Sequence, residues 1–153
     1  MTRVTAGPVC DARPPEGVVR MTNPILRGAL RSPIGRWIRG LAIIDHVGRR
    51  SGERRCVVVA WHELDGRAFA ITPAAWRANF RDGATAQVRH RGRTRAMHGT
   101  LVADTETVAA TLRTFFEAGG SPTSCGLRVE DGHTITAHDT AVVNRAIVWL
   151  DSL

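Results

Sequence analysis

The chain has 153 residues, of which 43% are hydrophobic and 23% are charged. This composition excludes a disordered, collagen-like or coiled-coil chain, and the length predicts one domain with a single core. All 21 basic residues are arginine and the net charge is +7, so the cations present can bind carboxylates or phosphates through two parallel hydrogen bonds.

The first segment, residues 1–20, is polar, lacks periodicity and contains Pro8, Pro14 and Pro15. We expect a flexible tail there and a single folded domain over residues 21–153. The segment also lacks the apolar stretch of a secretory signal, and no apolar run in the chain approaches the roughly 20 residues of a membrane-spanning helix. A cytoplasmic protein is therefore expected.

Two short amphipathic helices are predicted next. Thr22 or Asn23 caps the first helix, with Pro24 in its first turn, and the second helix lies within residues 34–41. Helices of this kind either pack on the domain's own core or lie on an anionic membrane surface, and the first arrangement is the more frequent. Peripheral membrane contact through these helices is kept as the alternative.

Beyond residue 40 the pattern is that of strands, in which β-branched and apolar residues lie between Gly-bearing turns. A short helix interrupts them at Pro73–Arg81, a longer amphipathic helix capped by Asp104 follows, and a further helix lies near Thr140–Arg145. Consecutive strands with short turns pair antiparallel, so we predict an α+β or mainly β fold, a split β-barrel of five or six strands with flanking helices. The predicted strands are Leu41–Val47, Arg55–Trp61, Arg67–Thr72, Ala84–Arg91, Arg95–Ala103 and Ala146–Leu150.

The positive charge is concentrated in the first two thirds of the chain. Residues 1–40 carry a net charge of +5, residues 41–103 carry +6 and residues 104–153 carry −4. Clustered arginines indicate an anionic partner, either a phosphorylated small molecule or a nucleic acid, although an arginine-rich solvated face has the same composition.

Several common types of site are excluded by motifs that the chain lacks. No G-x-G-x-x-G opens a strand–helix unit, and without lysine there is no Walker A loop. The six histidines are isolated in the sequence, so no metal site is predicted. Cys10, Cys56 and Cys125 show no C-x-x-C spacing and are expected to be reduced thiols.

The most informative motif is Gly48-Arg49-Arg50-Ser51-Gly52 with Arg54 and Arg55 after it. Backbone N–H groups of a Gly-bearing turn can bind an anion, the hydroxyl can donate to a phosphate oxygen, and arginines add charge-assisted bonds. An ordinary β-turn with exposed arginines fits the same pattern. Trp76-x-x-Asn79 is a second element, either a ring and an amide that face a ligand or a core anchor and a cap.

In combination these elements resemble the deazaflavin-dependent nitroreductase family of actinobacteria. The resemblance rests on I-I-D-H-V-G-R-R-S-G-E-R-R, a V-V-V strand, E-L-D-G-R-A-F-A-I-T, W-R-A-N-F-R-D-G and V-R-H-R-G-R-T-R within residues 41–104. The N-terminal helices and the helix after Asp104 also fit. Members of that family resemble the flavin-binding split β-barrels, and those characterised bind the coenzyme F420, whose phosphate and glutamyl tail are anionic.

The resemblance implies a coenzyme site in three parts. The hairpin with its arginines would bind the phosphate and tail, the following strand would pass its backbone along the ring edge, and the end of the next strand with the short helix would lie near the deazaflavin ring. These residues are Arg49, Arg50, Ser51, Gly52 and Arg55 for the tail, Val57 and Val58 for the ring edge, and Ile71, Thr72, Trp76 and Asn79 for the ring.

The function implied by the resemblance is transfer of a hydride between reduced F420 and a hydrophobic acceptor, such as a quinone or another conjugated carbonyl. The chain departs from the family's nitroimidazole-reducing member, whose substrate pocket is lined by tyrosines, because it contains no tyrosine. Its ring-side loop is also short, with Pro73-Ala74-Ala75 in place of a Gly-rich stretch. The sequence identifies no catalytic proton donor.

Alternatives to this function remain open. A non-enzymatic basic barrel could bind an anionic ligand or nucleic acid through Arg89–Arg95, but the aromatic residues mostly occupy core positions rather than stacking platforms, so no nucleic acid is expected. A protein of the same fold could instead use FMN or haem, or no cofactor. A homodimer is compatible with the sequence but is not required by it.

Overall fold

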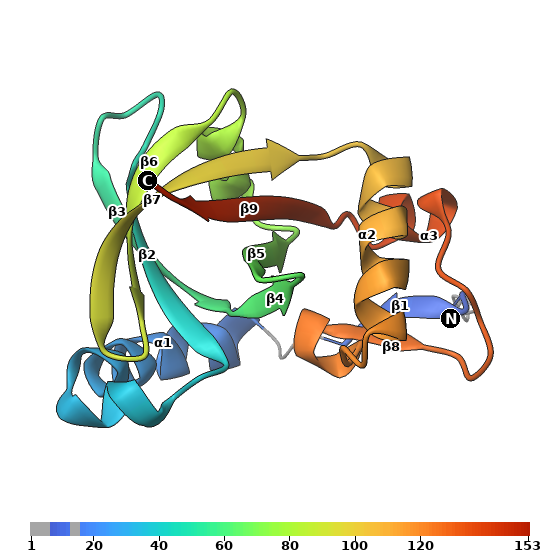
Figure 1. Ribbon diagram of the computed structural model, residues 1–153, viewed down its shortest axis with the longest axis horizontal. Coiled ribbons are helices and arrows are strands. Elements are labelled where there is room, and N and C mark those ends of the chain that lie inside the picture. Colours follow the sequence, from blue (N-terminus) through green and yellow to red (C-terminus); the bar gives the residue numbers. More distant parts are fainter. Residues whose placement is uncertain (1–6, 13–15) are drawn as a thin grey trace.

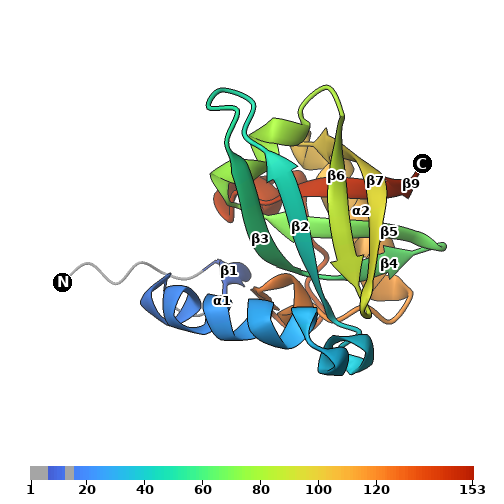
Figure 2. The ribbon, with the colours of Figure 1, turned by 90° about the vertical axis from the view of Figure 1, so that its left-hand side faces the viewer.

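The computed structural model describes residues 7–12 and 16–153. Its central feature is a curled antiparallel sheet of seven strands in the order β3–β2–β6–β7–β9–β5–β4, which forms half a barrel (Figures 1 and 2). A pair of short strands, β1 and β8, lies beside the helices α2 and α3 at the other end of the molecule (Figure 1). The strands are β1 (Val9–Asp11), β2 (Leu41–Val47), β3 (Arg54–Ala60), β4 (His62–Leu64), β5 (Arg67–Thr72), β6 (Ala84–His90), β7 (Arg93–Val102), β8 (Leu127–Val129) and β9 (Ala146–Ser152). The α-helices are α1 (Glu16–Arg31), α2 (Thr105–Glu117) and α3 (Ala137–Val142), and the 3₁₀ helices are η1 (Pro33–Trp37), η2 (Ala75–Phe80) and η3 (Thr123–Cys125).

This architecture is α+β and is compatible with the predicted split barrel. All six predicted strands are present, each within two residues of the expected bounds. The helix after Asp104 is also confirmed, because the Asp104 carboxylate caps α2 by accepting the Thr107 N–H at 2.9 Å. The structure adds β1, β4 and β8, which have three residues each.

The N-terminal segment contains more regular structure than the sequence predicts. Strand β1 pairs with β8, and α1 begins well before the expected cap, so that Pro24 lies inside the helix. Val9 is held in place because its side chain is buried against the core. The predicted tail over residues 1–20 is therefore wrong for these two stretches, while residues 1–6 and 13–15 lie outside the described residues.

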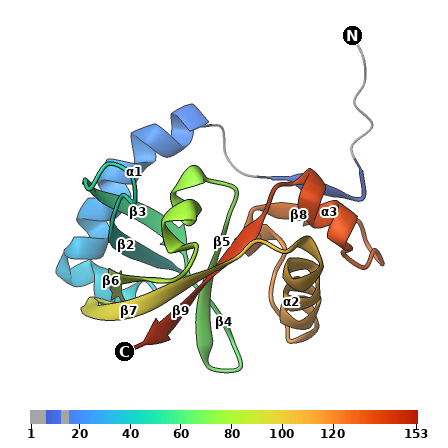
Figure 3. The same ribbon diagram turned by 90° about the horizontal axis from the view of Figure 1, so that it is seen from above.

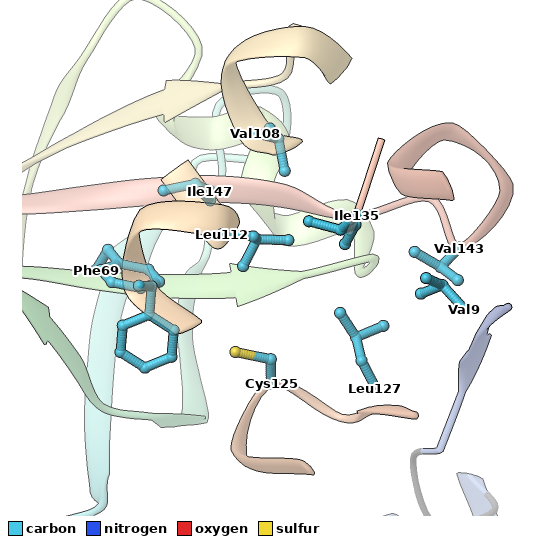
Figure 4. Packing of buried hydrophobic residues seen from close by; sticks show 10 residues of the cluster. Val9, Phe69, Val108, Leu112, Cys125, Leu127, Ile135, Val143 and Ile147 are labelled. Atoms are coloured by element: carbon cyan, nitrogen blue, oxygen red, sulfur yellow. The ribbon is translucent and has the colours of Figure 1, made fainter. Parts of the chain in front are cut away.

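Two apolar clusters fill the molecule, and the strands β5 and β9 contribute to both. One cluster lies inside the half-barrel, and the other, shown in Figure 4, lies under α2. Along β9, Ile147 packs under α2 while Val148 and Leu150 pack inside the half-barrel, because successive side chains of a strand point to opposite faces. The half-barrel cluster comprises Ala42, Ile44, Ala68, Phe80, Ala86, Val88, Met97, Val148 and Leu150, and the α2 cluster comprises Val9, Phe69, Val108, Leu112, Phe115, Cys125, Leu127, Ile135, Val143 and Ile147.

Helix α1 and the 3₁₀ helix η1 lie against the outside of the half-barrel (Figures 2 and 3). Arg89 on β6 donates to the carbonyl oxygens of Leu30 at 3.0 Å and Arg31 at 3.1 Å, which have no partner within the last turn of the helix. Gly35 approaches the same turn so closely that a Cβ there would lie 2.2 Å from the Leu30 oxygen. These contacts fix η1 beside the start of β2. No helix of the described residues is long and apolar enough to cross a membrane.

The strand register places two hairpins at opposite ends of the sheet. The β2–β3 connection follows Val47, which pairs with Arg54. The β6–β7 turn lies at the other end, because His90 at the end of β6 pairs with Ala42 at the start of β2. Figure 2 shows the first hairpin above the sheet and the second below it, next to η1.

Candidate functional site

The β2–β3 hairpin contains the predicted Gly-bearing turn, and it joins two adjacent antiparallel strands as expected. The Gly48 N–H donates to the Glu53 oxygen at 2.7 Å, and the Gly48 oxygen accepts the Gly52 N–H at 2.9 Å. Gly52 has a φ of 68°, a left-handed conformation that favours glycine. A Cβ on Gly48 would lie 2.5 Å from the Ser51 hydroxyl oxygen and would require that side chain to move, so the turn favours glycine most strongly at Gly52.

The 3₁₀ helix η2 is held against this hairpin by Asn79. The side-chain oxygen of Asn79 accepts the Arg49 backbone N–H at 2.8 Å, and its NH₂ group donates to the Trp76 carbonyl at 3.0 Å. Phe80 is fully buried and lies over Gly99 of β7, where a Cβ would come within 2.4 Å of the ring. Asn79 therefore positions the hairpin relative to Trp76, and Phe80 anchors η2 to the sheet.

A cavity of about 890 Å³ lies between the hairpin and η2. Its walls combine four arginines, one carboxylate, a hydroxyl, an amide and the Trp76 ring. No group of three or more His, Cys, Asp or Glu side chains that could hold a metal ion occurs within residues 7–12 and 16–153. The lining residues are Gly48, Arg49, Arg50, Ser51, Arg55, Ala75, Trp76, Ala78, Asn79, Arg81 and Asp82.

Three of the four arginines that line the cavity have no acidic partner among the described residues. Within the described part of the chain, the guanidinium groups of Arg50, Arg55 and Arg81 make no ion pair and no side-chain hydrogen bond. Arg49 instead binds the Asp82 carboxylate at 2.7 Å, in a pair that is largely exposed to solvent. Cationic side chains without a partner at a concave surface attract anions and can bind them through charge-assisted hydrogen bonds.

His46 lies behind this cavity, on the inner face of β2. Its ring is 4% exposed and lies 6.0 Å from the Trp76 ring and 5.6 Å from the Phe80 ring, measured between centroids. Neither ring nitrogen makes a well-formed hydrogen bond to a described residue. Burial lowers the pKa of His46, and the nearby Arg55 charge lowers it further, against weaker opposing contributions from its own strand's backbone and from Asp45. Burial therefore favours the neutral form of this imidazole.

The structure brings six of the eleven predicted site residues to the cavity. Gly52 shapes the turn but does not line the cavity. Four of the six come from the β2–β3 hairpin and the start of β3, and two come from η2. The six residues are Arg49, Arg50, Ser51, Arg55, Trp76 and Asn79.

The four residues predicted on the strands lie outside the cavity. Val57 packs against the half-barrel cluster, and Val58 lies on the opposite face of β3, where it pairs with Ile43. Ile71 packs against the α2 cluster. Thr72 is buried and its hydroxyl oxygen accepts the Ala74 N–H at 3.0 Å. The side chains of Val57 and Ile71 pack against the two clusters, and that of Thr72 is hydrogen-bonded within a turn.

The sequence did not identify several residues of this site. The lining residues missed are Ala75, Ala78, Arg81 and Asp82, and His46 was missed behind them, whereas Gly48 was placed in the hairpin motif but not among the site residues. Arg81 and Asp82 could have been found, because they come two and three residues after Asn79 in an Arg-Asp-Gly sequence typical of a turn. For His46 the signal is the alternation of β2, which places this histidine on the same face as the apolar Ala42 and Ile44.

Comparisons with known proteins give structural similarities but no relative by sequence. No protein-family model and no curated protein matches the chain. A solved structure described as a domain-swapped dimer is 13% identical with a TM-score of 0.44, over 89% of this chain and 98% of that one. The conserved hypothetical protein Rv2991 from Mycobacterium tuberculosis is 12% identical with a TM-score of 0.44, over 94% of this chain and 83% of that one. At these values neither structure identifies a family or a function for this chain.

Proposed function

We propose that the cavity between the β2–β3 hairpin and η2 binds the coenzyme F420, and that the protein is an F420-dependent oxidoreductase. The main support is the set of three arginines, Arg50, Arg55 and Arg81, that line the cavity without an acidic partner in the described part of the chain. The phosphate and carboxylates of the coenzyme tail would supply the missing anions. Trp76, in the same cavity, offers a flat apolar surface for the ring.

The residues of the chain would bind and orient the coenzyme, which supplies the hydride when bound. The Ser51 oxygen accepts the Glu53 N–H at 3.2 Å, which leaves the hydroxyl proton free to donate to a phosphate oxygen. Asn79 would act by holding the hairpin at a fixed position relative to Trp76, because both polar atoms of its side chain have protein partners. A hydrophobic acceptor such as a quinone or another conjugated carbonyl suits the apolar walls of η2.

Fluorescence titration of the purified protein with F420, beside FMN and haem, tests this proposal. Arg50→Ala is expected to weaken F420 binding about 10- to 150-fold, because a hydrogen bond to a charged group contributes about 1.5–3 kcal/mol. It should leave stability unchanged, because Arg50 is an exposed turn residue. Arg128→Ala is the matched control, since it removes the same charge from an exposed position on β8.

Each other outcome changes the proposal in a defined way. Binding of FMN or haem without binding of F420 would reassign the cofactor. Binding of none of them would leave a cofactor-free protein with an anion-binding cavity. An equal loss of affinity in Arg50→Ala and Arg128→Ala would mean that net charge, rather than this cavity, attracts the coenzyme. If F420 binds, oxidation of reduced F420 by a quinone tests the class of acceptor.

A further inference from the structure

A second groove lies at the opposite end of the half-barrel, where the β6–β7 turn meets η1 (Figure 2). Its volume is about 780 Å³. One wall comes from η1 and the residues after it, and the other comes from β6, β7 and the turn between them. The lining residues are Arg36, Trp37, Arg39, Glu63, His90, Arg91, Arg93 and Arg95.

Two contacts hold the walls of this groove together. A Cβ on Gly92 would lie 3.1 Å from the Cβ of Arg36 and 3.4 Å from its backbone, so only glycine allows the turn to lie this close to η1 without displacement. On the second wall, the Nε2 atom of His90 lies 2.7 Å from the Arg39 carbonyl oxygen, and it is the donor because a carbonyl oxygen only accepts. The groove is therefore a fixed feature of the fold.

Arg91 occupies a backbone position that disfavours arginine. Its φ is 53° and that of Gly92 is 77°, which is the conformation of a two-residue hairpin turn in which asparagine, aspartate or glycine is usual at the first position. A long side chain is held in the left-handed region at an energetic cost. Such strain is typical of positions where a particular side chain is needed for function.

The groove is strongly cationic, and its arginines have no acidic partners in the described part of the chain. Glu63 is the one carboxylate among the lining residues, and it accepts the Trp61 indole N–H at 2.9 Å. By contrast, the guanidinium of Arg89 donates hydrogen bonds to the carbonyl oxygens at the end of α1. The five groove arginines are Arg36, Arg39, Arg91, Arg93 and Arg95.

One aromatic face is available beside these arginines. Trp37 is 73% exposed, and the Arg36 guanidinium lies over one face of its ring, 5.2 Å from the centroid, so the platform available to a ligand is the opposite face. Trp61 is not available in the same way, because it stacks on His90 with ring centroids 3.9 Å apart. The groove thus combines a dense set of cations with a single exposed aromatic platform.

We propose that this groove binds a nucleoside di- or triphosphate, with the base on Trp37 and the phosphates on the arginines of the β6–β7 turn. Two or three linked phosphates match several arginines in one groove, because each guanidinium can bind phosphate oxygens through two hydrogen bonds. A single platform matches one base, whereas proteins that bind single-stranded nucleic acid stack successive bases on several aromatic side chains. This site is separate from the proposed coenzyme cavity.

Calorimetric titration with ADP, inorganic pyrophosphate and adenosine at about 0.15 M salt tests the proposal. ADP is expected to bind more tightly than pyrophosphate, and both more tightly than adenosine. Trp37→Ala should weaken ADP binding about 5-fold or more while leaving pyrophosphate binding unchanged, because only the base stacks. Arg91→Ala and Arg93→Ala should each weaken the binding of both ligands about 10-fold.

Two variants distinguish this groove from the rest of the surface. Arg50→Ala, in the first cavity, and Arg128→Ala, on β8, should leave ADP affinity unchanged. The inference is wrong if Arg50→Ala weakens ADP binding and the groove variants do not, because ADP then occupies the first cavity. It is also wrong if Trp37→Ala affects ADP and pyrophosphate equally. A single-stranded oligonucleotide that binds far more tightly than ADP would overturn it in favour of a polynucleotide.

Discussion

Single arginine side chains in this protein serve two different purposes. Some are part of the fold: Arg67 binds the Asp151 carboxylate through two hydrogen bonds of 2.7 and 2.9 Å, and Arg89 binds the last carbonyls of α1. Others line the two cavities without acidic partners. The sequence shows where arginines cluster, but the partners of Arg67 and Arg89 come from distant segments, so only the fold separates structural arginines from those available to a ligand.

His62 is the residue for which we expect the clearest effect of pH. Its ring is 4% exposed and packs on Phe69 and Phe115, with centroid distances of 5.1 and 5.4 Å. Burial lowers the pKa of His62 from 6.5 to about 4. The unfolded chain therefore takes up a proton at higher pH than the folded chain does. Stability should be fully present above about pH 6.5 and should fall by about 3 kcal/mol as the pH is lowered to about 4.

Urea denaturation over this pH range, with His62→Phe as the variant, measures the effect. Phenylalanine keeps an aromatic ring but does not titrate, so the free energy of unfolding of the variant should fall less than that of the wild type, by about 3 kcal/mol. A comparison at about pH 8 isolates the change in packing, because His62 is then neutral in both states. An equal fall in both proteins would assign the acid sensitivity to other groups, such as His46 and His90, whose pKa values burial also lowers.

At the level of elements, the contact between Phe80 and Gly99 of β7 helps to position η2, beside the hydrogen bonds of Asn79. A Cβ on Gly99 would lie 2.4 and 2.7 Å from two ring atoms of the buried Phe80. Gly99→Ala should therefore displace η2, destabilise the protein by about 1–3 kcal/mol, and weaken F420 binding by moving Trp76. Thermal unfolding and F420 titration measure the two effects. Gly40→Ala is the control, because a Cβ there meets no atom within 4 Å. Unchanged stability in Gly99→Ala would show that Phe80 is not the anchor.

The elements that could be predicted are those with a long local pattern. The strands of six residues or more were recognised from their β-branched and apolar residues between turns, and α2 has a cap and four buried apolar positions. Strands of three residues are too short to show a period. The pairing of β1 with β8 joins Val9 to Val129, and a contact across most of the chain leaves no local signal. Helix α1 was placed too late because Pro24 usually begins a helix, whereas here it lies inside one.

The candidate site likewise contains residues that could be predicted from the sequence and residues that could not. The hairpin could be predicted because its glycines, serine and arginines are consecutive in the sequence, and the structure places them beside Trp76. Val57 and Ile71 were assigned from resemblance; neither lines the cavity, and their side chains pack against the half-barrel cluster and the α2 cluster, respectively. His46 belongs to the site only because Trp76 and Phe80 fold back over β2. That arrangement depends on the docking of η2, which has no signature in the residues of β2.

At the scale of the whole molecule, the two apolar clusters are not independent. Ala68 of β5 packs inside the half-barrel while its neighbour Phe69 packs under α2. Arg145, at the start of β9, is 3% exposed and donates to the Gly126 carbonyl at 2.9 Å and to the Asp11 carboxylate at 3.2 Å. The same segment thus connects β1 and β8 to the half-barrel. We expect the two clusters to unfold together. Strands β5 and β9 contribute side chains to both, so the loss of either strand would expose both clusters to solvent.

Leu112→Ala tests this coupling. Leu112 lies on α2, is fully buried in the α2 cluster and does not contribute to the half-barrel cluster. The cavity it leaves should lower the free energy of unfolding by about 2–5 kcal/mol. Hydrogen exchange should then accelerate to the same extent in the most protected amides of β2 and β6 as in those of α2, since both would exchange through global unfolding. Leu153→Ala is the matched control, because this leucine is 75% exposed and its loss should change neither quantity. Faster exchange confined to α2, α3 and β8 would contradict the prediction, because it would mean that the α2 cluster opens while the half-barrel and both of its arginine-lined cavities stay folded.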